Sequence, residues 1–109
     1  MELSRMTYHL TASYPGEEKF GLVSQMRRAA VSIPSNLAEG AAGSSDNEFR
    51  NVLSIARSSL SELDTRLDLS QQLGFITVES RSEVDGLLTR VDKMLYALYQ
   101  LKKPTAQTR

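Results

Sequence analysis

One stretch decides the fold of this chain, and from Ser24 to Gly40 it reads SQMRRAAVSIPSNLAEG. Apolar side chains recur in steps of three or four through this stretch and the residues just before it. That spacing is typical of one buried face of an α-helix. The apolar positions are Phe20, Val23, Met26, Ala30, Ile33 and Leu37. The pattern therefore predicts a helix that buries one side along its whole length.

Pro34 stands inside this helical pattern. A proline within a helix removes one backbone hydrogen bond and costs about 3 kcal/mol or more. The apolar period nevertheless continues from Ile33 to Leu37, so we predict one kinked helix rather than two separate helices. Ser32 and Ser35 are expected to offer their hydroxyls to carbonyls that the proline leaves free.

The polar residues of the stretch allow two interpretations. Arg27 and Arg28 are adjacent, so they point about 100° apart on a helix and cannot form one clamp. They are either structural, paired with a carboxylate of another helix or subunit, or they form a site for an anion or a phosphate. Asn36 and Glu39 lie close to the apolar stripe, where polar groups need partners. With Glu62 they are predicted to form a buried polar network.

The first half of the chain holds two predicted helices. Leu3, Met6 and Leu10 have helical spacing and indicate a short first helix over residues 1–12. A turn over 13–16 leads into the second helix, which is expected to begin near Glu17. It should end in the run from Gly40 to Gly43, where glycine suits the cap of a helix.

The second half of the chain shows clearer boundaries. Between Phe49 and Leu67 the apolar residues alternate in steps of four and three, which is typical of packing in an antiparallel bundle. Ser45 followed by Glu48 fits a capping box at the start of this third helix. Gly74 is expected to end it, and Thr77 is the predicted N-cap of a fourth helix.

Two surfaces of these later helices are candidates for binding. Arg50 and Arg57 lie among serines on the outer side of the third helix, which predicts either a polar groove for a phosphate backbone or a solvated surface. The fourth helix is apolar or aromatic nearly all round near its end. Met94, Tyr96 and Tyr99 are therefore predicted to form a subunit interface, because tyrosine is enriched at interfaces. The alternative is that the short first helix leaves these side chains partly exposed.

Composition excludes several classes of protein. The 109 residues carry 13 basic and 13 acidic side chains, one histidine (His9) and no cysteine. The net charge is zero, so a surface for nucleic acid must be a local patch or one created by assembly. A disulfide framework, a thiolate metal site and the Glu-x-x-His pairs of a di-metal bundle are absent from the sequence. No cofactor is predicted. The absence of a transmembrane pattern and of a signal-peptide pattern predicts a cytoplasmic protein with no membrane partner.

Three stretches carry a resemblance to a known family. They are Glu17–Gly40, Phe49–Leu63 and Leu73–Phe75, which together span about residues 17–75. The chain resembles the four-helix-bundle proteins encoded in intervening sequences of bacterial large-subunit ribosomal RNA genes. In that family Arg27 and Arg28 match an arginine pair, whereas the fourth helix matches only in its apolar character.

The resemblance implies an antiparallel up-down-up-down bundle that assembles as a homopentamer. It also implies kinship with the accessory proteins of diversity-generating retroelements, which bind nucleic acid through basic surface and partner a reverse transcriptase. The chain departs from the family in its shorter first helix and in its zero net charge.

These observations together predict an all-α four-helix bundle over residues 1–103 and a frayed tail over 104–109. The predicted function is that of a non-catalytic, self-assembling scaffold or adaptor, because the sequence offers no pair of a nucleophile and a general base. The alternative is an RNA- or DNA-binding accessory protein that uses Arg27, Arg28, Arg50 and Arg57 from several subunits. Another protein remains a further candidate partner.

Overall fold

The structure is a computed structural model, in which residues 1–43 and 45–102 are described. Their regular structure is entirely helical, which confirms the predicted fold class. The elements are α1 (Glu2–Thr11), the 3₁₀ helix η1 (Gly16–Glu18), α2 (Leu22–Ala41), α3 (Asp46–Gln72) and α4 (Val78–Lys102).

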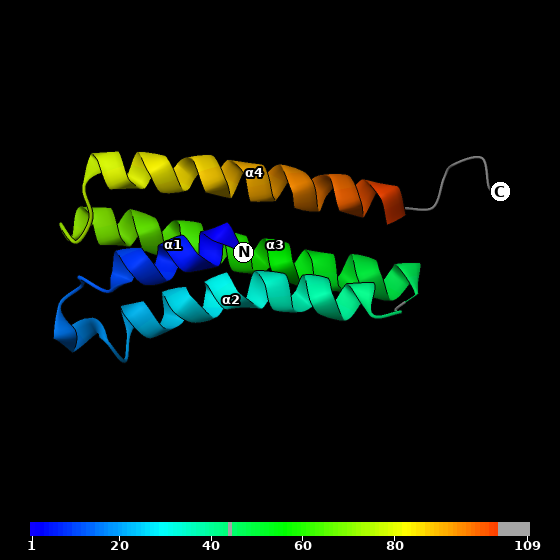
Figure 1. The fold of residues 1–109 in the computed structure, drawn as a ribbon, viewed down its shortest axis with the longest axis horizontal. Coiled ribbons are helices and arrows are strands. Elements are labelled where there is room, and N and C mark those ends of the chain that lie inside the picture. The colour runs from blue at the N-terminus through cyan, green and yellow to red at the C-terminus, as the bar shows by residue number, and fades with distance from the viewer. Residues whose placement is uncertain (44, 103–109) are drawn as a thin grey trace.

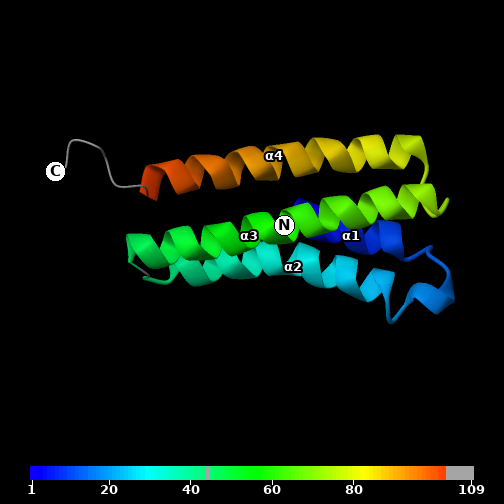
Figure 2. The same ribbon diagram turned by 180° about the vertical axis from the view of Figure 1, so that it is seen from behind.

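The four α-helices run antiparallel to their neighbours in the chain (Figures 1 and 2). Each packs on two others, since α1 lies against α2 and α4, and α3 lies against α2 and α4. This is the neighbour pattern of an up-down-up-down bundle. The first helix is short, as predicted, and its N-terminus lies near the middle of the bundle's length (Figure 1).

The core is built from the predicted stripes. Met26, Ile33, Leu53, Leu63 and Leu95 are completely inaccessible to solvent. α1 adds Leu3 to this core, together with two threonines that the apolar pattern did not include. Their hydroxyls donate to backbone carbonyls four residues earlier, at 2.8 Å for Thr7 and 2.7 Å for Thr11. Burial therefore leaves neither hydroxyl unsatisfied.

The predicted boundaries of α3 and the predicted start of α4 are confirmed. The Ser45 hydroxyl accepts a hydrogen bond from the Glu48 backbone N–H, and the Glu48 carboxylate accepts one from the Ser45 N–H in return. At the start of α4 the Thr77 hydroxyl accepts from the Ser80 N–H at 3.0 Å. Gly74 has a φ of 81°, the left-handed conformation that glycine adopts without strain.

α2 passes through Pro34 as one helix, as predicted. Contrary to the prediction, the carbonyl that Pro34 leaves without a helical donor is not bonded by Ser32 or Ser35. Proline lacks the N–H that would bond to the carbonyl of Ala30, four residues earlier. The Ser4 hydroxyl of α1 donates to that carbonyl at 3.0 Å. Ser32 instead shares a hydrogen bond with Ser59 of α3, at 2.9 Å. The proline thus creates an acceptor that ties α1 to α2.

The start of α2 differs from the prediction. The helix begins at Leu22 rather than near Glu17, because Gly21 has φ −115° and ψ −102° and interrupts the helical backbone. Glycine is less favourable than alanine inside a helix by roughly 1 kcal/mol, so ending the helix at Gly21 sacrifices little helix stability. Phe20 consequently lies outside the buried stripe and is 89% exposed.

Gly40 is a packing residue rather than the cap. α2 continues to Ala41, and Gly43, with a φ of 102°, supplies the left-handed turn. A Cβ on Gly40 would lie 2.6 Å from Phe49 Cδ1 and 2.8 Å from Val52 Cγ2. The missing side chain therefore permits the close approach of α2 and α3.

The structure leaves the predicted C-terminal limit of the bundle untested. The predicted limit at residue 103 and the tail over 104–109 lie outside the described residues. Within the described residues, no helix combines the length and the apolar character needed to cross a membrane.

Candidate functional site

A groove of about 470 Å³ lies between α1, the start of α2 and the segment that joins them. We call it the α1–α2 groove. Its lining includes Val23 and Val31, two aromatic rings and three cationic side chains. These rings and cations belong to Tyr8, Lys19, Phe20, Arg27 and Arg28. No carboxylate lines it, although the whole chain is electrically neutral.

Arg27 joins α2 to the end of α1. Its Nε donates to the Thr11 hydroxyl at 2.9 Å, and its Nη2 donates to the Tyr8 carbonyl at 3.3 Å. Its guanidinium carbon also lies 4.5 Å from the centroid of the Tyr8 ring. A cation suits this place, because the last carbonyls of a helix carry partial negative charge. The structural interpretation applies to Arg27, but its partners are neutral and not carboxylates.

Arg28 points elsewhere, as the 100° between adjacent residues requires. It is exposed, and its Nη2 donates at 2.7 Å to the side-chain oxygen of Gln25. Among the described residues neither Arg27 nor Arg28 pairs with a carboxylate. The two arginines therefore differ in role, with one holding α1 in place and the other left exposed in the lining of the groove.

Arg50 and Arg57 lie on the other side of the bundle, between α3 and α4. Arg50 donates to the Lys102 carbonyl at the end of α4 and to the Asn47 side chain. Arg57 lies 3.9 Å from a carboxylate oxygen of Asp92, with its guanidinium carbon 5.6 Å from the Tyr96 ring centroid. Within one chain the four predicted arginines thus form two separate groups.

The residue that the sequence interpretation missed is Arg81 on α4. Its side chain is only 11% exposed and meets three aspartates that are each more than half exposed. Its Nη2 donates to Asp64 at 2.5 Å and its Nε donates to Asp85 at 2.8 Å, while Nη1 lies 2.9 Å from Asp68. Asp64 and Asp68 stand four residues apart on α3, a spacing that places both carboxylates on one side of the helix. This spacing does not indicate their partner, because it comes from another helix.

The surroundings of Arg81 favour its charged form. Burial opposes its ionisation, but the hydrogen bond and charge of Asp85 and the charges of Asp68 and Asp64 outweigh burial and raise its pKa. Nearby, burial raises the pKa of Tyr14, while Ser70 and Arg81 act in the opposite direction. The Tyr14 hydroxyl lies near Ser70 without forming a hydrogen bond of good geometry.

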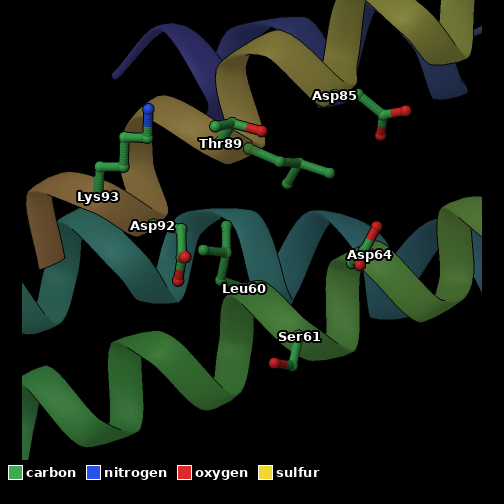
Figure 3. A pocket seen from close by; sticks show the side chains of 8 residues that line it. Leu60, Ser61, Asp64, Asp85, Thr89, Asp92 and Lys93 are labelled. Atoms are coloured by element: carbon green, nitrogen blue, oxygen red, sulfur yellow. The ribbon is translucent and has the colours of Figure 1, made fainter. Parts of the chain in front are cut away.

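A second groove, of about 550 Å³, lies between α3 and α4, and we call it the α3–α4 groove. Figure 3 shows Asp64 on α3 and Asp85 and Asp92 on α4 along this groove, with Lys93 beside them. Arginines already occupy these carboxylates, since Arg81 binds two of them and Arg57 approaches the third. In residues 1–43 and 45–102 no cluster of three or more His, Cys, Asp or Glu side chains is arranged to hold a metal ion.

Among the described residues, the three members of the predicted polar network are not buried together. Asn36 is half-buried and donates to the Ser32 carbonyl at 2.7 Å. Glu39 and Glu62 are exposed, so their predicted burial is wrong for the single chain. The apolar stripe of α2 is narrower than assumed near Glu39, and Glu62 points outward from α3 and pairs with Arg66 at 3.0 Å.

The predicted interface residues of α4 divide between different surfaces. Met94 and Tyr96 are exposed, but residues two apart on a helix lie on nearly opposite sides. Tyr96 faces Arg57 of α3. Tyr99 is half-buried and packs on the core. These residues therefore do not form one patch.

Comparison with known proteins assigns the chain to a family. The family model described as 23S rRNA-intervening sequence protein matches residues 1–97. The chain belongs to this family. No curated protein matches it. Among solved structures, the crystal structure of a protein of unknown function from the S23 ribosomal protein family of Bacteroides thetaiotaomicron superimposes with a TM-score of 0.80. That likeness covers 90% of this chain and 92% of the other at 24% identity, so it supports the fold alone.

Proposed function

We propose that this chain is a cytoplasmic, non-catalytic helical bundle that assembles with copies of itself, as a scaffold or adaptor. The observation that carries this proposal is the apolar surface on the C-terminal half of α4. Leu101 is 78% exposed and Met94 is 40% exposed. With the half-buried Leu98 they recur in steps of four and three, which places them on one side of the helix.

This apolar surface is open because α1 is short. α1 has 10 residues and is roughly 15 Å long, whereas α4 has 25 residues and is roughly 37 Å long. The end of α1 lies beside the start of α4, where His9 and Leu10 share a small groove with Thr77 and Ser80. α1 therefore covers only the N-terminal half of α4. A second copy of the chain is the proposed cover for the rest, and the homopentamer implied by the family resemblance sets the expected number of subunits.

Sedimentation velocity at micromolar concentration tests this proposal. The wild-type protein should sediment as a multiple of its 12.1 kDa chain mass. Leu101→Lys should shift it toward 12.1 kDa, because a charge on the apolar contact opposes association. Val78→Lys, at another exposed apolar position that lies at the start of α4, is the matched control and should leave assembly unchanged. A wild-type protein that sediments as a single chain would contradict the proposal.

Nucleic-acid binding is the second candidate function, favoured by the α1–α2 groove. Lys19, Arg27 and Arg28 share the groove without a carboxylate, and repetition in an assembly would multiply this local charge. Fluorescence anisotropy with structured RNA and duplex DNA across a salt series tests it. Binding should weaken steeply as salt rises, because phosphate contacts release counterions. Incubation of the same RNA with and without magnesium tests the non-catalytic assignment, since cleavage would contradict it.

A further inference from the structure

We infer that the α1–α2 groove binds an unpaired nucleotide of a single-stranded nucleic acid, with the base stacked on Phe20 and the neighbouring phosphate held by Lys19 and Arg28. This inference rests on the second candidate function and names its ligand. It depends on an exposed aromatic ring, on cations with neutral partners, and on the size and lining of the groove.

Phe20 offers a free aromatic surface. At 89% exposed it is the most exposed large hydrophobic side chain in the described part of the chain. The break at Gly21 fixes this position, because it separates Phe20 from the buried stripe of α2. Bases stack on exposed aromatic rings in proteins that bind single strands, and every base has a face that can do so.

The cations around this ring are available to an anion. Lys19 Nζ lies 5.6 Å from the centroid of the Phe20 ring, so a phosphate next to a stacked base would lie close to the amine. Within residues 1–43 and 45–102, the partner of Arg28 is the neutral side chain of Gln25, and a phosphate would replace this contact with a charge-assisted hydrogen bond. Arg27 adds positive charge at the side of the groove while it remains bonded to α1.

The remaining features favour an unpaired nucleotide over a duplex. The groove has a volume of about 470 Å³, a size typical of sites for small organic ligands, and Val23 and Val31 add apolar side chains to its lining. In a duplex the faces of the bases are already stacked, so Phe20 would find no partner there. Unpaired bases are the ones that splay out onto aromatic side chains. Charge complementarity and the exposed ring together therefore point to a single strand.

The test uses the full chain and a single-stranded RNA that carries 2-aminopurine, the same RNA annealed to its complement, and the same strand as DNA. Either single strand should bind more tightly than the duplex by at least about fivefold, the lower end for one stacked base. The 2-aminopurine fluorescence should fall on binding because the base stacks. Phe20→Leu should remove both the preference and the quenching, whereas Phe20→Tyr, which keeps a ring, should retain them.

Two matched variants separate this site from general effects. Arg28→Ala should weaken binding to the single strand and reduce its salt dependence, whereas Arg5→Ala, an exposed arginine paired with Glu2, should not. Leu69→Ala, an exposed apolar residue on α3, is the control for Phe20→Leu. Equal binding of single strand and duplex, unaffected by Phe20→Leu, would overturn this inference but leave nucleic-acid binding in place. No binding of any strand at low salt, or displacement of the strand by poly-glutamate at equal charge, would overturn both.

Discussion

The pair α1–α2 and the pair α3–α4 are held together by different kinds of polar contact. Across α1 and α2 the donors Ser4 and Arg27 reach backbone carbonyls and a hydroxyl, all of them neutral. Across α3 and α4 the buried Arg81 reaches aspartates of both helices. The neutral partners in the α1–α2 pair leave the charge of Arg27 uncompensated. In the α3–α4 pair the aspartates compensate the charge of Arg81. A chain of zero net charge can therefore carry one basic groove and one acidic groove on different sides.

The largest effect is expected at the charged contact. Arg81→Ala should lower the free energy of unfolding by about 3 kcal/mol, because it leaves three carboxylates facing one another without their cation. The value lies at the lower end for a broken buried pair, since the aspartates are more than half exposed and can hydrate. Urea unfolding at fixed protein concentration measures it. Arg5→Ala, which breaks an exposed pair, should cost less than about 1 kcal/mol. Equal losses for the two variants would show that Arg81 is no more structural than a surface arginine.

The next effect separates the adjacent arginines. Arg27→Ala should lower the free energy of unfolding by about 1 to 2 kcal/mol, because it removes two hydrogen bonds to α1 and the contact with the Tyr8 ring. Arg28→Ala should change it by less than about 0.5 kcal/mol, as is usual for an exposed side chain. The same unfolding experiment compares them. A larger loss for Arg28 would contradict the division of roles between the two residues.

A smaller effect is expected at the proline. Ser4→Ala should cost about 1 kcal/mol, because the Ala30 carbonyl loses its donor. Pro34→Ala restores a backbone N–H within α2, so Ser4→Ala should cost less in that background. A double-mutant cycle measures the difference between the two costs. Equal costs in the two backgrounds would show that the proline and the serine are independent.

The smallest effect at neutral pH is expected at Tyr14. Its hydroxyl makes no hydrogen bond, so Tyr14→Phe should change the free energy of unfolding by less than about 0.5 kcal/mol at pH 7. Burial raises the pKa of the folded state above the ordinary 10.0, so the folded protein retains the phenol proton when the unfolded chain loses it. Stability that is fully present below pH 10 should therefore fall as the pH rises above it, and less so in the variant. Unfolding curves at several alkaline pH values measure this difference, and parallel curves would contradict it.

Much of the fold was predictable because its signals are local. Helical periodicity located α3 and most of α2, and Ser45, Thr77 and Gly74 marked boundaries through contacts within a few residues. The start of α2 was misplaced because the periodic pattern includes Phe20 and cannot register the backbone break at Gly21. The end of α2 within the run from Gly40 to Gly43 was predicted, but the packing role of Gly40 was not, because its close neighbours belong to α3.

The candidate sites were less predictable than the helices. Arg27 and Arg28 were identified as a pair, but their different partners follow from the position of α1, which the sequence of α2 does not contain. Arg81 has no distinguishing signal in the sequence, since on its own helix it is one arginine among acidic residues. Its three partners become a cluster only when α3 lies against α4.

Sequence alone was enough to establish that this chain forms four helices, where α3 begins and ends, where α4 begins, and which residues of α3 and α4 form the core. These properties depend on spacing and on capping, both of which act over a few residues. The tertiary structure decided which arginines are paired with other side chains and which remain exposed. It also placed the neighbouring residues Lys19 and Phe20 beside Arg28 of α2 in one groove. The physical reason is that a side-chain charge or hydroxyl is satisfied by whatever lies within about 3 Å, and across helices those neighbours come from distant parts of the chain.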